Sequence, residues 1–296
     1  MLRRLTAPVA TLGGLVTAGI VDRALTPGVK PLTTAATSTL NTVGPIRLYQ
    51  YEICPFCNKI KALLDLYRVP YETLEVNPLT KKEYKDIGSD YRKVPVAMLG
   101  EEQVNDSAVI AKVLLERIGA AGVVPAAELK HFSSPSALEW AEWSDKKFSV
   151  LLFPNITRSF SESFEAFGYV MQVPHFSLLD KVSNQFVGAF FMWLAQDSPA
   201  LLEDLTAGKI KKKYFIDDER AALHAGIHEW LRDGVGDKPF AGGDKPNLAD
   251  ISVFGALKAI DRTAAHKEIL AETSISPWYN RVKALVDPGN SCTLRQ

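Results

Sequence analysis

A cysteine pair between a predicted strand and a predicted helix constrains this chain most. The pair is Cys54-Pro-Phe-Cys57. Apolar residues alternate before it and recur at helical spacing after it: Ile46 and Leu48, then Ile60, Leu63, Leu64 and Tyr67. Proline is tolerated in the first turn of a helix because the N–H that it lacks has no partner there. The order predicts a strand, a turn and a helix, with Cys54 at the helix N-terminus.

The predicted position of Cys54 favours thiolate chemistry. Unpaired backbone N–H groups and the positive end of the helix dipole stabilise negative charge at a helix N-terminus. The pKa of a cysteine there can fall from about 8.5 to roughly 3.5–7.5. Cys54 is therefore the candidate nucleophile, and Phe56 is expected to offer apolar surface to a molecule bound over it.

A zinc site and a structural disulfide are two other interpretations of the cysteine pair. A closed zinc site needs four ligands, but the third cysteine, Cys292, lies in a polar C-terminal tail and the nearest histidine is His131. A disulfide between cysteines three positions apart closes too short a loop to stabilise much. A cysteine pair that opens a helix after a strand indicates redox or thiol chemistry. We therefore predict no metal ligands.

Length and charge limit the functional classes. A chain of 296 residues with 47% hydrophobic content can bury two modest cores, so two domains are expected. Its 34 basic and 34 acidic residues give a formal net charge of zero, which provides no overall basic field for nucleic acid. Three cysteines argue against a secreted scaffold built on disulfides.

Residues 1–42 differ in composition from the rest of the chain. They carry Arg3, Arg4, Arg23 and Lys30 against one acid, Asp22. The uncharged run between Arg4 and Asp22 is at the low edge of the roughly 17–25 residues that span a membrane. An acid-poor, arginine-bearing start also resembles an organelle transit peptide. The segment is predicted to be a membrane anchor or a cleaved transit peptide, with a disordered tail as a lesser alternative.

Residues 43–120 continue with alternating strands and helices. Strands are predicted over 71–76, 94–99 and 102–104, a short polar helix over 80–87 and a longer helix over 108–118. The order βαβαββα, with Cys-Pro-x-Cys after the first strand, resembles a thioredoxin/glutaredoxin domain. In that superfamily a Val-Pro peptide before the third strand is cis and faces the active-site cysteine, a place that Val94-Pro95 matches. An ordinary trans proline in a turn is the alternative.

Two further features lie near the predicted site. Asp106 and Ser107 precede the last helix of this domain, where such side chains cap unpaired N–H groups. Glutathione transferases hold the γ-glutamyl end of glutathione with the same acid–serine pair, and a helix N-terminus supports that binding. Tyr51, three residues before Cys54, either hydrogen-bonds to the cysteine sulfur or to a substrate oxygen, or packs on the strand end.

After a connector over 121–135, helical periodicity dominates residues 136–288. Helices are predicted over 136–150, 178–195 and 214–231, and the second of these is apolar enough to be buried. His224 and His228 have the i, i+4 spacing of metal ligands but lack the His-Glu-x-x-His carboxylate, so a solvated or satisfied helix face is expected. Asn247 and Asp250 form a capping pair before a strongly apolar helix. Such a capping box is typical of the second domain of glutathione transferases. A tail over 289–296 ends the chain.

Taken together, five motifs resemble the membrane-associated prostaglandin E synthase 2 family. They lie at residues 48–57, 91–95, 153–158, 245–250 and 277–282. The resemblance implies a thioredoxin-like domain followed by an all-helical domain like that of glutathione transferases, usually in a homodimer. It also implies a deep pocket between the domains that binds glutathione and sometimes haem, and membrane association at the mitochondrion or Golgi.

Carried over position by position, the resemblance assigns roles to single residues. Cys54 would be the catalytic thiol, Tyr51 its hydrogen-bond partner and Cys57 a companion; Val94, Pro95, Asp106 and Ser107 would bind glutathione. The implied activity is isomerisation of a lipid endoperoxide, prostaglandin H, to prostaglandin E. A glutathione-dependent thiol–disulfide oxidoreductase and a non-catalytic protein that binds haem and glutathione stay open as alternatives.

Overall fold

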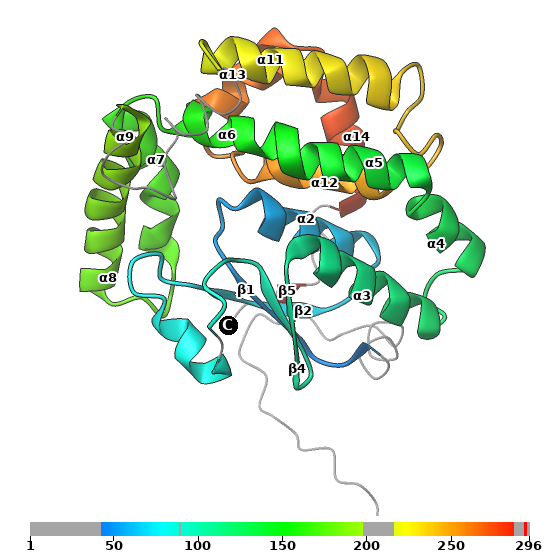
Figure 1. Ribbon diagram of the computed structural model, residues 1–296, viewed down its shortest axis with the longest axis horizontal. Helices are drawn as coiled ribbons and strands as arrows, with labels where there is room; N and C mark the ends of the chain where they lie inside the picture. Colours follow the sequence, from blue (N-terminus) through cyan, green and yellow to red (C-terminus); the bar gives the residue numbers. More distant parts are fainter. Residues whose placement is uncertain (1–42, 89, 198–215, 287–292, 295–296) are drawn as a thin grey trace, which may run out of the picture. The chain divides into compact units, whose positions relative to one another are not determined.

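Five strands form the sheet around which the first part of the chain folds. The computed structural model describes residues 43–88, 90–197, 216–286 and 293–294. The strands are β1 (Ile46–Gln50), β2 (Tyr71–Glu75), β3 (Val96–Leu99), β4 (Glu102–Asn105) and β5 (Thr293–Leu294), in the order β4-β3-β1-β2-β5 (Figure 1). The last strand belongs to the predicted tail and extends the β2 edge. The predictions for residues 1–42 and for Cys292 lie outside the described residues.

The central strand β1 explains how the helices are placed. It runs parallel to β2 and antiparallel to β3. Two adjacent parallel strands need a crossover connection, which here is helix α2 (Pro55–Leu66). Leu48 pairs with Thr73 on one side and Ala97 on the other, and it is fully buried. The predicted position of the cysteine pair, between β1 and α2, is therefore correct.

The rest of the first region also follows the predicted order. A hairpin joins β3 to β4 at Gly100, whose φ of +72° favours glycine. Helix α3 (Ser107–Ala120) follows, and the short polar helix is a 3₁₀ helix, η1 (Lys82–Ile87). The stretch expected as a connector, residues 121–135, contains a helix, α4 (Ala126–Phe132).

Helices make up the remainder of the described chain. They are α5 (Pro135–Trp143), α6 (Ser149–Ile156), α7 (Phe160–Phe167), η3 (Gly168–Gln172), α8 (Leu178–Ser183), α9 (Ala189–Asp197), α11 (Glu219–Glu229), α12 (Leu248–Lys258), α13 (Ala264–Glu272) and α14 (Ser276–Val286). Three π-helical segments adjoin them: η2 (Ser144–Phe148), η4 (Asn184–Gly188) and η5 (Trp230–Val235). Among the described residues, no helix is long and apolar enough to cross a membrane.

Helix α12 joins the two regions. The predicted capping pair is present: Asn247 Oδ1 accepts from Asp250 N at 3.2 Å, and Asp250 Oδ2 accepts from Asn247 N at 2.9 Å. Asp250 also accepts from Trp278 Nε1 at 2.8 Å. The helix packs directly on α2 (Figure 1), and a Cβ at Gly255 would lie only 2.4 Å from the backbone N of Lys59. Residues of both regions consequently share one hydrophobic core.

The apolar segment over 178–195 is helical, as predicted, but it is not buried. Leu178, Leu179 and Phe186 are 73%, 78% and 52% exposed. Composition indicated burial because the run is apolar, but several of its apolar side chains point away from the core. The prediction of a buried helix at this place is wrong.

Candidate active site

Cys54 occupies the N-cap of α2, the position expected for it. Its backbone is extended, Pro55 opens the helix, and the Cys54 sulfur accepts a hydrogen bond from Cys57 N at 3.4 Å. Both cysteines are free thiols; Cys57 is fully buried, whereas Cys54 keeps 9% of its surface exposed. The helix thus directs backbone N–H groups at the sulfur of Cys54 and shields the sulfur of Cys57 from solvent.

The two thiols have opposite tendencies to ionise. Burial raises the pKa of Cys54, but hydrogen bonds from the Cys57 thiol and from the N–H groups of Cys57 and Phe56 outweigh it, so the pKa of Cys54 lies below its usual value. Burial raises the pKa of Cys57 well above its usual value, and the hydrogen bond to Cys54 and the Cys54 charge add to this. The arrangement favours a Cys54 thiolate supported by a protonated Cys57.

Tyr51 lies beside the cysteines without bonding to their sulfur. Its carbonyl accepts from Cys54 N at 3.0 Å, while its ring packs in a small cluster with Tyr49, Tyr84 and Val96. Among the described residues, its hydroxyl makes no hydrogen bond to Cys54. Burial and the nearby cysteine charges raise the pKa of Tyr51 above its usual value, so the hydroxyl stays protonated and can donate a proton.

A buried polar network holds the turn that precedes Cys54. Glu75 Oε1 accepts from the backbone N of Glu52 at 3.0 Å, and Glu75 Oε2 accepts from Gln50 Nε2 at 3.1 Å. Lys61 Nζ pairs with Glu52 Oε2 at 2.9 Å, and Asn58 Nδ2 donates to the carbonyl oxygens of Glu52 and Cys54. This network was not predicted from the sequence. The charged residues Glu75 and Lys61, within a predicted strand and a predicted helix, could have indicated it.

Glu75 is expected to make stability depend on pH. Burial raises its pKa from 4.5 to about 8, so the folded chain binds this proton more tightly than the unfolded chain does. Stability should fall as pH rises from about 4.5 to about 8. Glu75→Gln should flatten this dependence in urea denaturation at several pH values between about 5 and about 9. Glu72→Gln, on the same strand, is the control. If the stability of Glu75→Gln still fell with pH as in the wild-type chain, Glu75 would not be the group responsible.

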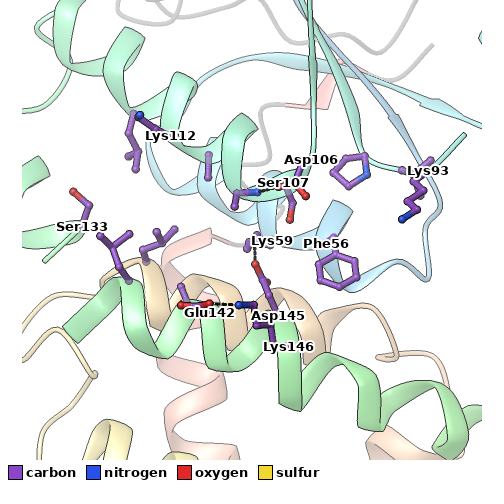
Figure 2. A pocket seen from close by; sticks show the side chains of 18 of the residues that line it. Phe56, Lys59, Lys93, Asp106, Ser107, Lys112, Ser133, Glu142, Asp145 and Lys146 are labelled. Atoms are coloured by element: carbon purple, nitrogen blue, oxygen red, sulfur yellow. Dashed lines mark hydrogen bonds and ion pairs between the residues drawn. The ribbon is translucent and has the colours of Figure 1, made fainter. Parts of the chain in front are cut away.

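A cavity of about 920 Å³ opens beside the cysteine turn, between α3, α5 and the loop before β3 (Figure 2). It is lined by five residues predicted as substrate or glutathione contacts: Phe56, Val94, Pro95, Asp106 and Ser107. The Val94–Pro95 peptide is cis, as the resemblance implied. The lining does not include Cys54, Cys57 or Tyr51. Cys54 is thus outside the lining, although Phe56, two residues after it in the same turn, is part of the lining.

Asp106 and Ser107 fit the binding of a small ionic group. The Asp106 carboxylate caps α3 by accepting from Ala108 N at 2.8 Å, so its role as an N-cap is confirmed. Ser107 is only 6% exposed, but its hydroxyl oxygen keeps some contact with solvent and makes no hydrogen bond within the described part of the chain. Burial raises the pKa of Tyr91, which is close to Asp106 and also lines the cavity. The Ser107 hydroxyl and the start of α3 are thus available to a ligand.

Four lysines line the cavity, and none of them was predicted from the sequence: Lys59, Lys93, Lys112 and Lys146. Lys59 is 3% exposed and its Nζ lies 2.5 Å from Asp145 Oδ2, an ion pair that joins α2 to η2 (Figure 2). Lys93, next to the cis peptide, is exposed at the other end of the lining. Lys59 lies two residues after Cys57, on a helix face that is otherwise apolar. A charged residue at such a position was the one sequence signal that could have predicted a buried ion pair there. Because Lys59 is already paired with Asp145, the exposed Lys93 and Lys112 are the cations that suit the two carboxylates of a bound peptide.

The residues fit glutathione better than haem. The cavity lining offers a serine hydroxyl, a helix N-terminus and lysines to a charged tripeptide. It contains no His, Cys or Met, the side chains that most often bind haem iron. The expectation of haem thus finds no support in this lining.

The sequence relates the chain to known proteins. Residues 48–121 match the family described as Glutathione S-transferase, N-terminal domain. Prostaglandin E synthase 2 of Danio rerio is 29% identical over 285 residues, which cover 83% of this chain and 72% of that protein. Prostaglandin E synthase 2 of Mus musculus is 28% identical over 300 residues, or 87% and 74% of the two chains.

Solved structures share the fold at low sequence identity. The beta-etherase LigF from Sphingobium sp. strain SYK-6 has a TM-score of 0.53 and 16% identity, covering 81% of this chain and 95% of that one. Human glutathione-S-transferase T1-1 in its apo form has a TM-score of 0.50 and 14% identity, covering 83% and 85%. The predicted fold, a thioredoxin-like domain followed by a helical domain, is confirmed. The chain is thus similar to the prostaglandin E synthase 2 proteins, and its residues 48–121 match the N-terminal domain of glutathione transferases.

Proposed function

We propose that this protein is a glutathione-binding isomerase that converts a prostaglandin H-type endoperoxide to prostaglandin E. One observation carries the proposal: a cysteine with a lowered pKa lies two residues before Phe56, which lines a cavity whose lining suits glutathione. The names of the relatives give the product, prostaglandin E, and the endoperoxide substrate is the one that the sequence resemblance implies. The largely apolar wall made by Phe56, Leu115 and Leu138 suits such a lipid.

The reaction needs no external oxidant or reductant. The Cys54 thiolate attacks the endoperoxide oxygen that becomes the ketone, so an S–O bond forms and the O–O bond breaks. The freed oxygen takes a proton, for which Tyr51 is the proposed donor. The carbon bearing the S–O group then loses its hydrogen as a proton, the C=O bond forms, and the S–O electrons return to sulfur. One proton is taken up and one released, and the thiolate is regenerated.

The test supplies one substrate to one protein sample under two conditions. Prostaglandin H is supplied with and without glutathione, and prostaglandin E is measured by mass spectrometry. We expect formation above the buffer control. Formation equal to that of the buffer control would overturn the proposed activity.

A second function is favoured by Cys57. A second thiol three residues after the nucleophile can resolve a mixed disulfide once it has lost its proton and attacks the Cys54 sulfur as a thiolate. As a thiol–disulfide oxidoreductase, the protein would reduce a glutathione mixed disulfide, with the electrons supplied by a second glutathione. Turnover of this substrate without prostaglandin E formation would favour this function, and turnover of neither substrate would favour a binding protein.

Glutathione affinity tests the role of Ser107. Ser107→Ala should weaken glutathione binding about tenfold, because a hydrogen bond to a charged group is lost. Ser133→Ala is the matched control: it lines the same cavity, but its hydroxyl already donates to Leu129 O at 2.8 Å. Calorimetric titration measures both. Equal affinities in the two variants would remove Ser107 from the proposed site. Homodimer formation, membrane association and organelle location stay predictions from the sequence.

A further inference from the structure

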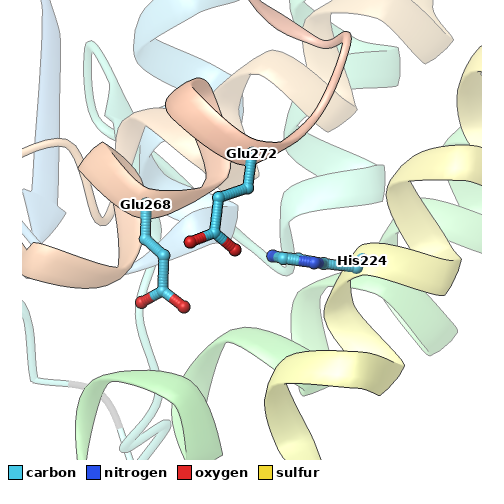
Figure 3. Close-up of side chains that lie close together, drawn as sticks. All are labelled: His224, Glu268 and Glu272. Atoms are coloured by element: carbon cyan, nitrogen blue, oxygen red, sulfur yellow. The ribbon is translucent and has the colours of Figure 1, made fainter.

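Three potential metal ligands lie close together in the fold, in a part of the sequence far from the cysteines. They are His224 on α11 and Glu268 and Glu272 on α13 (Figure 3). One imidazole nitrogen and one oxygen of each carboxylate all lie within 4.8 Å of one another. Glu268 and Glu272 are one helical turn apart, so they share a face of α13. That face is turned toward His224 (Figure 3).

His224 departs from the sequence-based expectation. A solvated or satisfied histidine was predicted, but Nε2 of His224 is shielded from solvent and has no hydrogen-bond partner among the described residues. His228, one turn further along α11, is exposed as expected. A buried imidazole nitrogen without a partner is costly. A ligand bound there would remove this cost.

Arg220 holds part of the cluster in place. Its guanidinium pairs with Glu268 Oε2 at 2.9 Å and donates to Asn155 Oδ1 at 2.9 Å. Glu268 Oε1 remains for another partner. The ion pair between Arg220 and Glu268 is of the kind that orients carboxylate ligands in metal sites. Two carboxylates against one guanidinium leave a net negative charge that a cation would balance.

We propose that His224, Glu268 and Glu272 bind a divalent transition-metal ion, for which Zn²⁺ is the probe. Imidazole nitrogen and carboxylate oxygen are ligands that Zn²⁺ accepts at about 2.0–2.2 Å, with water in a fourth position. The three ligand atoms lie within 4.8 Å of one another, so the side chains would move closer together around the ion. The ion would tie α11 to α13 and lies outside the cavity lining, so its role is structural.

The experiment measures Zn²⁺ binding by the full chain after treatment with a chelator. It uses a Cys54→Ser, Cys57→Ser background, so that these two thiols do not bind the ion. Zn²⁺ should raise Tm, because it binds the folded state. His228→Ala should keep this rise, whereas His224→Ala should lose it. Glu272→Gln, a change at an exposed position, should weaken binding at least about tenfold in calorimetric titration.

Co²⁺ provides an independent spectroscopic measurement. Visible absorption bands that appear on adding Co²⁺, and vanish in His224→Ala, would support the site. Two results would overturn it: no rise in Tm with Zn²⁺ in the background protein, or equal affinity in the His224→Ala and His228→Ala variants. In either case the three side chains form at most a hydrogen-bonded His–Glu pair.

Discussion

Replacing Cys54 with serine is expected to lower prostaglandin E formation at least about a thousandfold, because a serine hydroxyl stays protonated at neutral pH and is a far weaker nucleophile. Cys57→Ser should keep most of the activity. In the structure, Cys57 is fully buried and acts on Cys54 only through a hydrogen bond. The measurement is the initial rate of each variant with saturating glutathione.

The pH dependence of alkylation provides the control for this pair. In the wild-type chain, the rate of Cys54 alkylation by iodoacetamide should reach half its maximum at a pH below that of an ordinary cysteine. Cys57→Ala removes a hydrogen bond that lowers the Cys54 pKa, so the midpoint should move upward. Full turnover by both Cys54→Ser and Cys57→Ser would exclude the thiol mechanism.

Gly255→Ala is expected to destabilise the fold by about 2 kcal/mol, in spite of the better helix propensity of alanine. The added Cβ would meet Lys59 N at 2.4 Å and Lys59 Cα at 2.6 Å. These are backbone atoms, so no side-chain rotation relieves the clash and α12 must move away from α2. Because Cys54 caps α2, catalytic activity should fall together with stability.

Gly168→Ala is the matched control for this prediction. A Cβ there has its nearest contact with Gln185 Nε2 at 3.8 Å, which is an ordinary distance. Its stability should change by no more than about 0.5 kcal/mol. Chemical denaturation of the two variants gives the comparison, and equal stabilities would show that the α2–α12 contact is looser than the structure indicates.

The sequence predicted the elements whose signals are local. A strand, a Cys-Pro turn and a helix follow each other within some twenty residues, and Asn247 and Asp250 cap a helix from three positions apart. Such patterns depend on neighbours in the chain, so they can be read without knowing the fold. The same holds for Asp106 at the start of α3.

The features that were missed depend on residues distant in sequence. The Lys59–Asp145 pair joins positions 86 residues apart, and His224 meets Glu268 and Glu272 only after α11 and α13 have packed. The apolar segment over 178–195 was predicted to be buried because composition does not show which face of a helix is turned outward. The absence of Cys54 from the cavity lining is likewise a result of packing.

The continuous core beneath α2 and α12 has a consequence for motion. Where two layers meet through a large apolar contact, they do not swing apart as separate bodies. The walls of the cavity beside the cysteine turn belong to these same layers. Under the proposed function, a bulky lipid would therefore enter by displacement of individual side chains, and thermal unfolding should occur in a single cooperative transition.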